Sequence, residues 1–276
     1  MTTTVSFAVD SPAGRHVVSV SYERQGHGEP LVLLHGIGHH RQAWDPVLRV
    51  LAAERDVIAV DLPGFGASAA LPDGLAHDLR TMVPVLGAFF ETLGVVRPHV
   101  AGNSLGGLLA LRLGHEKLVR SVTALSPAGF WTRSERRYAF GVLRAMRAAA
   151  LALPMPVIER LAGSSPGRTA LTSTIYARPG RRSPGAVVSE TVALREATGF
   201  RQTLEAGLTV AFTDDVPDVP VSIAWGDKDR LLPRRQGVRA KQVIPGARLV
   251  RLPGCGHVPM NDDPAAVARV ILDTSR

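Results

Sequence analysis

A serine is flanked by glycines in the stretch Gly102-Asn103-Ser104-Leu105-Gly106. An apolar run, Pro98 to Ala101, precedes it, and the helix-forming run 105–113 follows. Between a strand and a helix, Gly-x-Ser-x-Gly predicts a tight turn that exposes the serine oxygen and leaves no room for flanking side chains. A flexible loop of small residues is the alternative. The flanking elements favour a nucleophile, which we predict to be Ser104.

A serine hydroxyl needs a base, and the base needs an orienting acid. His257 ends the run L-P-G-C-G-H, directly after an apolar segment. The run W-G-D-K-D ends another apolar segment and offers two acids, Asp227 and Asp229. The alternative roles are helix capping for His257 and turn formation for either aspartate. The order serine, acid, histidine favours the catalytic interpretation, and the spacing leaves both acids open.

Acyl transfer also requires donors for the oxygen that becomes negative, and loss of one donor costs about 3 kcal/mol. The backbone amide of Leu105, directly after the serine, is one candidate. The H-G-I-G of His35 to Gly38 follows the apolar run 31–34. It offers a second donor through the backbone amide of Ile37.

Strand and helix patterns alternate around these residues. Two segments with period-two alternation, 5–9 and 16–22, flank the turn-forming D-S-P-A-G and predict an antiparallel hairpin. The later apolar runs suit strands buried on both faces, which indicates an α/β domain with a mainly parallel sheet. The expected strands are 31–34, 57–60, 98–101, 119–125, 219–225 and 248–252, and the expected helices are 44–54, 75–93, 105–113 and 264–272.

The alternation stops between about Pro127 and Asp218. This stretch has helical patches, no clear strand, and, over residues 128–212, twelve arginines against five acidic residues. We predict a helical insertion at 128–217 that covers the sheet, with residues 1–127 and 218–276 forming the core domain.

Five motifs in order resemble the signatures of the α/β-hydrolase superfamily, in its serine-nucleophile branch with a helical cap. They are H-G-I-G from His35, D-L-P-G-F-G-A-S from Asp61, G-N-S-L-G-G from Gly102, G-D-K-D ending at Asp229, and G-H ending at His257. The resemblance implies a mostly parallel sheet with helices on both faces. It also favours Asp229 over Asp227 as the acid and assigns Asp61 no catalytic role.

The substrate pocket expected from this resemblance involves His35, Gly36, Asn103 and Val258. From the inserted segment it adds Phe130 and Trp131, and the same segment offers further apolar candidates. These are Tyr138, Met146 and Met155.

The implied activity is hydrolysis of a carboxylic ester or lactone through an acyl-enzyme. Carbon-carbon bond hydrolysis of vinylogous diketones is an alternative, because those enzymes share an asparagine at the position of Asn103. They carry Pro-Gly where this chain has His39 and His40, and an aromatic residue where it has Val258. A non-enzymatic, ligand-binding member of the fold is the third interpretation.

The amino-acid composition limits the kinds of ligand and partner to be expected. The single cysteine, Cys255, excludes an internal disulfide and a four-cysteine metal site. We expect no cofactor, and no metal at the histidines of H-G-I-G-H-H. The net charge of +8 comes mostly from arginine, so nucleic acid is not expected. No apolar run reaches the ~20 residues of a membrane span, and the N-terminus does not resemble a signal peptide, which predicts a cytoplasmic protein acting on a small molecule.

Overall fold

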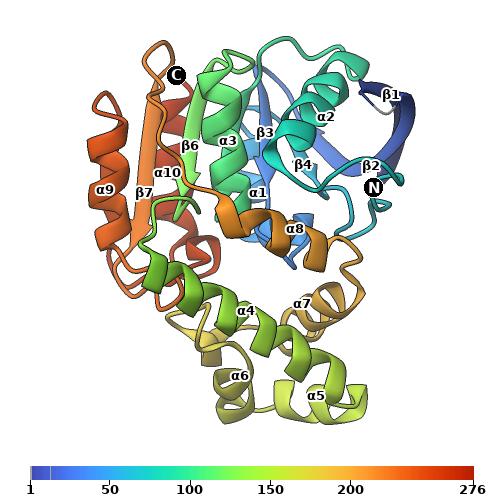
Figure 1. Ribbon diagram of the computed structural model, residues 1–276. Coiled ribbons are helices and arrows are strands. Elements are labelled where there is room, and N and C mark those ends of the chain that lie inside the picture. Colours follow the sequence, from blue (N-terminus) through green and yellow to red (C-terminus); the bar gives the residue numbers. More distant parts are fainter. Residues whose placement is uncertain (1, 13) are drawn as a thin grey trace.

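The central sheet is built from the short apolar runs of the sequence. The computed structural model describes residues 2–12 and 14–276. Within them, one sheet has the strand order β1-β2-β4-β3-β5-β6-β7-β8, and the six strands β3 to β8 run parallel (Figure 1). The strands are β1 Thr3–Ser11, β2 Gly14–Gly26, β3 Pro30–Leu34, β4 Asp56–Val60, β5 His99–Asn103, β6 Ser121–Leu125, β7 Val221–Gly226 and β8 Arg248–Leu252.

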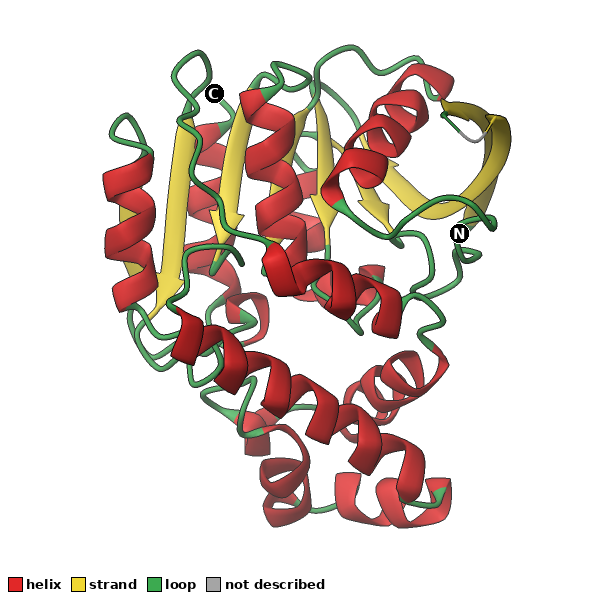
Figure 2. Ribbon diagram, viewed as in Figure 1, coloured by secondary structure: helices red, strands yellow, loops and turns green. Residues whose placement is uncertain are grey.

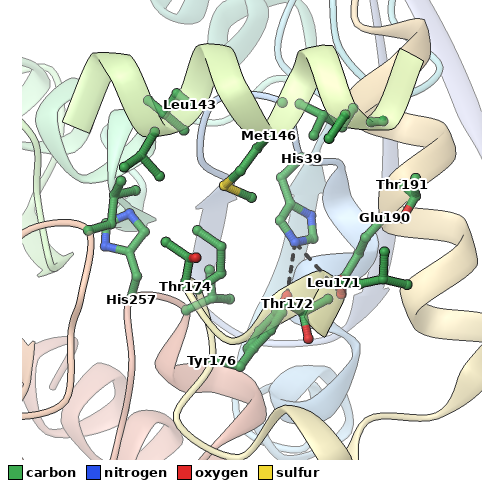
Figure 3. A pocket seen from close by; sticks show the side chains of 18 of the residues that line it. His39, Leu143, Met146, Leu171, Thr172, Thr174, Tyr176, Glu190, Thr191 and His257 are labelled. Carbon is green, nitrogen blue, oxygen red and sulfur yellow. Dashed lines mark hydrogen bonds and ion pairs between the residues drawn. The ribbon is translucent and has the colours of Figure 1, made fainter. Parts of the chain in front are cut away.

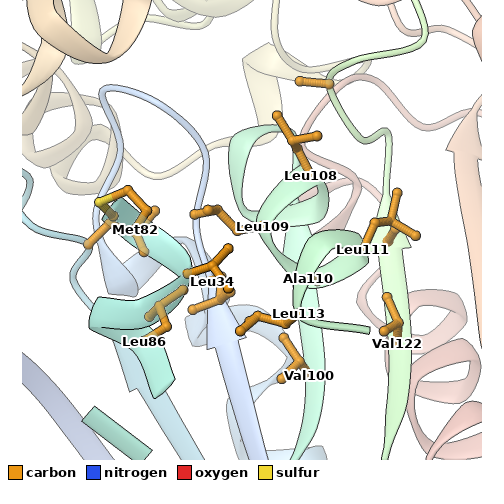
Figure 4. Close-up of a cluster of buried hydrophobic side chains, with 14 of the residues drawn as sticks. Leu34, Met82, Leu86, Val100, Leu108, Leu109, Ala110, Leu111, Leu113 and Val122 are labelled. Atoms are coloured by element: carbon orange, nitrogen blue, oxygen red, sulfur yellow. The ribbon is translucent and has the colours of Figure 1, made fainter. Parts of the chain in front are cut away.

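The strand side chains alternate between two buried layers. Leu31 and Leu33 belong to one apolar cluster, and Val32 and Leu34 belong to the other, with each side chain at most 1% exposed. Because successive strand residues point to opposite faces, burial on both sides requires a continuous apolar run. Each such side chain contributes roughly 1.5–3 kcal/mol on burial. Figure 4 shows Leu34 among the side chains of the second cluster.

Helices cover both faces of the sheet (Figure 2). On one face, α2 and α3 pack over the strands, and α1 and α10 pack together on the other. The helices that flank the sheet are α1 Asp45–Ala52, α2 Leu79–Thr92, α3 Leu105–His115, α9 Arg235–Val243 and α10 Pro264–Thr274. The expected sheet with helices on both faces is confirmed.

The segment between β6 and β7 is helical and lies beyond the carboxyl ends of the parallel strands (Figure 1). Its first helix starts with a capping box between Thr132 and Glu135. Glu135 also forms ion pairs with Arg235 and Arg239, which tie this helix to α9. Its helices are α4 Arg133–Ala152, α5 Met155–Ala162, α6 Ser165–Thr172, α7 Pro184–Glu196 and α8 Phe200–Ala206.

Two features differ from the sequence-based expectation. The two strands of the hairpin are longer than predicted. The predicted turn D-S-P-A-G includes Ala13, which like Met1 lies outside the described residues. The helix α9 was missed. Its buried residues are Gln236, Gly237 and Ala240, none of which is a large apolar residue, so it lacks the apolar periodicity by which helices are recognised.

A membrane span was not expected from the sequence. Among the described residues, no single helix combines the length and apolar composition needed to cross a membrane. The pair α4 and α5 passes such a test only when combined, and the two helices are bent by 110° at their junction.

Candidate active site

Ser104 occupies the turn between β5 and α3 with φ 56° and ψ −111°. A positive φ is unfavourable for a residue with a side chain and costs about 1–3 kcal/mol. Backbone hydrogen bonds hold the turn: the Ser104 amide donates to the Leu125 carbonyl at 2.9 Å, and its carbonyl accepts from the Ala128 amide at 3.0 Å. Strain at one residue, stabilised by its neighbours, is typical of a functional position.

The flanking glycines are required by close backbone contacts. A Cβ at Gly102 would lie 2.0 Å from the Gly106 carbonyl oxygen, and a Cβ at Gly106 would lie 2.1 Å from the Leu34 carbonyl oxygen. The strand, the turn and the helix therefore approach too closely for any side chain at either position. This tight, strained turn differs from a flexible loop and has the geometry expected of a nucleophile elbow.

His257 follows β8 and contacts Asp229, which follows β7. The distance from His257 Nδ1 to Asp229 Oδ2 is 2.8 Å, and both side chains are buried. The other carboxylate oxygen, Oδ1, accepts from the amides of Leu231 at 2.9 Å and Leu232 at 2.8 Å. Because an ionised carboxylate only accepts, the proton of a neutral His257 ring belongs on Nδ1, and this tautomer has its lone pair on Nε2.

The backbone of His257 is also fixed. Its amide donates to the Ile175 carbonyl at 2.8 Å, and its carbonyl accepts from Asn103 Nδ2 at 2.9 Å. Asn103 is the residue before Ser104, so one side chain connects the serine turn to the histidine loop.

Asp227, the second candidate acid, lies away from the histidine side chain. Its Oδ1 accepts from the Gly254 amide and its Oδ2 from Arg251, each at 2.8 Å. The hydrogen bond from Arg251 lowers the pKa of this carboxyl group below its ordinary value. Asp227 thus joins the β7 loop to the β8 loop, and only Asp229 contacts His257.

Ser104 and His257 line the same cavity, together with Gly36 and Ile37. A Cβ at Gly36 would lie 3.3 Å from Ser104 Cβ, so the H-G-I-G loop packs beside the serine. Within the described residues no hydrogen bond joins Ser104 Oγ to His257. Such bonds are often long in the absence of substrate and shorten in the complex.

The two candidate oxyanion donors, the amides of Leu105 and Ile37, belong to residues that line a cavity together with Ser104. Leu105 is the first residue of α3, where the backbone amide has no intrahelical acceptor. Ile37 lies in the loop after β3. Both residues line a small cavity of about 60 Å³ that also contacts Ser104.

The main cavity has a volume of about 620 Å³ and extends beneath α4 (Figure 3). Leu143 and Met146 point into it from α4, while His257 lies at one side. Most of the other lining side chains are apolar, among them Val142, Leu153, Ile158, Leu161, Leu171 and Leu194. The cavity therefore suits an extended apolar group next to the serine.

One wall of this cavity is polar, and sequence analysis missed it. His39 Nε2 lies 3.3 Å from the Tyr176 hydroxyl and 3.8 Å from a Glu190 carboxylate oxygen (Figure 3). His39 follows the H-G-I-G motif, but Tyr176 and Glu190 lie in no recognisable motif. Their only signal was a location in the inserted segment.

The structure places some of the predicted pocket residues in the lining of a cavity and others away from one. Gly36, Asn103, Val258 and Met146 line the main cavity, and Trp131 lines the small one. The remaining predicted pocket residues lie elsewhere.

Phe130 does not line either cavity, contrary to the expectation from the sequence. It is 4% exposed and packs against Phe212 with ring centroids 5.6 Å apart. Tyr138 is 49% exposed and donates to the Arg230 carbonyl. Met155 lies outside both cavities. A run of amphipathic helices did not reveal which face would be turned toward the serine.

His35 also lies outside the lining of both cavities, although the sequence placed it in the substrate pocket. It is fully buried, its Nε2 accepts from the Leu62 amide at 3.0 Å, and its Nδ1 donates to the Gly36 carbonyl at 2.7 Å. Burial lowers the pKa of His35 to about 4, so the ring remains neutral. Its role is to hold the H-G-I-G loop against the loop after β4.

The described residues contain no group of three or more histidine, cysteine or acidic side chains arranged to hold a metal. Cys255 is buried, and desolvation raises the pKa of its thiol to about 12. The thiol is therefore protonated at neutral pH and packs as an apolar side chain.

Two buried histidines lead us to expect that the folded protein loses stability at acid pH. Desolvation lowers the pKa of both His35 and His99 to about 4. As pH falls from about 6.5 to 4, the unfolded chain gains protons that the folded chain does not, so the free energy of unfolding falls. We expect His99→Asn to reduce this fall by about 1 kcal/mol, allowing for solvent screening.

Denaturant titrations at pH 7 and pH 4.5 measure how far the free energy of unfolding falls between the two pH values. His27→Asn replaces an exposed histidine and serves as the matched control. An equal fall in the free energy of unfolding for wild type and His99→Asn would contradict the expected effect.

The strand order, the serine elbow and the histidine-aspartate pair define an α/β hydrolase. A sequence profile of the alpha/beta hydrolase family matches residues 31–270, and the chain belongs to this family. A pimeloyl-[acyl-carrier protein] methyl ester esterase of Aeromonas hydrophila is 32% identical to it, over 92% of this chain and 98% of that protein.

Solved structures are similar in fold. An esterase from Thermogutta terrifontis has a TM-score of 0.77 at 20% identity, over 98% of this chain and 97% of that one. A meta-cleavage product hydrolase from Pseudomonas fluorescens has a TM-score of 0.74 at 19% identity, over 93% and 94% of the two chains. Both kinds of hydrolase share this fold, so the fold does not distinguish the two reactions.

Proposed function

We propose that this protein is a serine esterase that cleaves a carboxylic ester or lactone carrying an extended apolar group. The observation that supports this most is the buried Asp229–His257 pair, whose histidine lines the same cavity as Ser104 on its strained turn. The esterase name of the Aeromonas hydrophila relative agrees with it.

In the proposed reaction, His257 Nε2 accepts the Ser104 proton while Oγ attacks the ester carbonyl carbon. Asp229 stabilises the resulting imidazolium, and the Ile37 and Leu105 amides donate to the oxyanion. The carbon-oxygen bond to the leaving group then breaks, and the leaving alkoxide takes the proton from His257. His257 then takes a proton from water as the water oxygen attacks the acyl carbon. The bond between that carbon and Ser104 Oγ breaks, and Oγ takes the proton back from His257 as the carboxylic acid is released.

We propose that residues 128–217 act as a cap that selects the substrate, with residues 1–127 and 218–276 as the catalytic core. The cap helices supply most of the apolar lining of the cavity. Burial of each methylene contributes about 0.8 kcal/mol, so this lining favours medium-length chains over acetyl groups.

A series of p-nitrophenyl esters tests the proposed function. We expect kcat/KM to rise from acetate to octanoate, because additional methylenes leave water for the apolar cavity. A vinylogous diketone measured beside the series distinguishes carbon-carbon bond cleavage. Rapid turnover of the diketone with no turnover of any ester would contradict the esterase proposal.

Met146→Trp is expected to shorten the preferred chain. An indole in place of the thioether fills space beneath α4, and exclusion of two methylenes corresponds to about 1.6 kcal/mol, or a tenfold or larger fall in the octanoate-to-acetate ratio of kcat/KM. Leu151→Trp, at a position 52% exposed on the same helix, is the matched control. An unchanged ratio in Met146→Trp would contradict this location for the acyl chain.

A further inference from the structure

A second cavity of about 620 Å³ adjoins the main cavity at Glu190. Three arginines line it, Arg178, Arg181 and Arg182, and we call it the arginine cavity. Glu190 lines both cavities. The two spaces therefore share one acidic side chain.

Arg182 is the most deeply buried of the three arginines, with 7% of its side chain exposed. It forms an ion pair with Glu190, and its guanidinium carbon lies 4.2 Å from the centre of the Tyr176 ring. Its Nε has no hydrogen-bond partner within the described residues. A buried donor without an acceptor is costly, and an oxyanion in this cavity would supply acceptors for the arginine group.

The local charge favours an anion. Asp45 and Glu190 are the acidic side chains in the lining, and Glu190 is neutralised by Arg182. Neither Arg178 nor Arg181 has a carboxylate partner within the described residues. Arg178 Nη1 donates to the Asp262 carbonyl oxygen at 3.4 Å, and Asp45 offsets part of the positive charge. Three arginines against two carboxylates leave the lining with a net positive charge.

The start of α7 adds to this potential. Ser183 caps this thirteen-residue helix, and its first-turn residues Gly185 and Ala186 line the arginine cavity. Helix N-termini carry partial positive charge and unpaired amides that favour anions. Because the Ala186 amide donates to Ser183 Oγ at 3.2 Å, the helix contributes mainly its partial positive charge, and the arginine side chains supply the donors.

We propose that the arginine cavity binds an oxyanion, a carboxylate or phosphate group, outside the serine site. The group is either a free anion or a substituent on the substrate. An anion there competes with Glu190 for Arg182 and leaves the Glu190 carboxylate less well neutralised at the wall of the main cavity. The binding site itself does not depend on the proposed esterase activity.

Titration calorimetry with inorganic phosphate tests binding directly. At constant ionic strength, set with sodium chloride, we expect saturable binding to wild type and to Ser104→Ala alike, because the site lies apart from the serine. Arg181→Gln and Arg178→Gln are each expected to weaken binding by at least fivefold. Arg160→Gln, at an exposed position of α5, is the matched control and should bind within twofold of wild type.

Binding that is absent in wild type, or that weakens equally in Arg160→Gln, would overturn the proposal. The substitutions at Arg178 and Arg181 alter exposed side chains, so folding is expected to be retained, and circular dichroism checks it. Since calorimetry needs no turnover, failure here is distinguishable from failure of the esterase proposal.

Kinetics with a matched pair of esters, one neutral and one ending in a carboxylate, distinguish the two sources of the anion. If the substrate carries it, Arg181→Gln raises KM for the carboxylated ester alone by at least fivefold. If a free anion occupies the site, phosphate changes kcat/KM of both esters in wild type and has no effect in Arg181→Gln. If the two esters respond alike to Arg181→Gln, phosphate has no effect on kcat/KM and calorimetry detects no binding, both sources of the anion are excluded.

Discussion

Replacing Ser104 with alanine is expected to lower kcat for ester hydrolysis by about 10⁴- to 10⁶-fold. Alanine removes the oxygen that forms the acyl-enzyme, and loss of the nucleophile in a serine, histidine and acid arrangement has effects of about this size. The substitution preserves Cβ and the strained backbone, so the loss would report the missing hydroxyl. Steady-state assays and intact-mass detection of an acylated wild-type protein provide the measurement.

Ser104→Gly is the companion variant. It also lacks the hydroxyl, but glycine adopts a positive φ without steric cost. We expect it to be as inactive as Ser104→Ala and more stable by about 1 kcal/mol, because the strain at φ 56° is relieved. Activity above about one per cent of wild type in either variant would contradict nucleophilic catalysis by Ser104.

Asp229→Asn is expected to lower kcat by about 10⁴-fold, as this carboxylate-to-amide change does when it reverses the histidine tautomer. The amides of Leu231 and Leu232 both donate to Asp229 Oδ1. An asparagine must keep its carbonyl oxygen there, which turns its NH₂ group toward His257. The ring would then accept at Nδ1 and carry its proton on Nε2, where it cannot take the proton of Ser104.

Asp227→Asn is the matched control, because it makes the same chemical change two residues away. Asp227 pairs with the exposed Arg251 and caps the Gly254 amide. We expect kcat within about threefold of wild type and a stability loss of at most about 1 kcal/mol, as for exposed ion pairs. Equal loss of activity in both variants would refute the assignment of Asp229 as the orienting acid.

Short-range constraints explain what was predictable from the sequence. The runs at 31–34, 57–60 and 98–101 identified parallel strands because burial on both faces allows only apolar residues. The glycines at 102 and 106 identified the serine turn because a Cβ at either position meets backbone at about 2 Å. The positions of Ser104, His257 and the paired acids could therefore be predicted, since each directly follows a strand whose end lies at the same edge of the sheet.

Packing between distant segments of the chain decided which acid pairs with His257 and which residues line the main cavity. Asp227 and Asp229 are equivalent by composition, and only the fold of the β8 loop brings His257 to one of them. His35 and Phe130 belong to chemically suitable residue types, but packing buries them away from the main cavity.

By itself, the sequence determined the α/β-hydrolase fold and the chain order of the candidate catalytic residues, because these depend on patterns within a few residues of each other. The tertiary structure decided the size of the cavity, its polar wall and the adjoining arginine cavity. These arise where the β3 loop, carrying His39, meets Tyr176, Arg182 and Glu190 of the inserted segment. Contacts between segments about 140 residues apart in the chain leave no local pattern in the sequence.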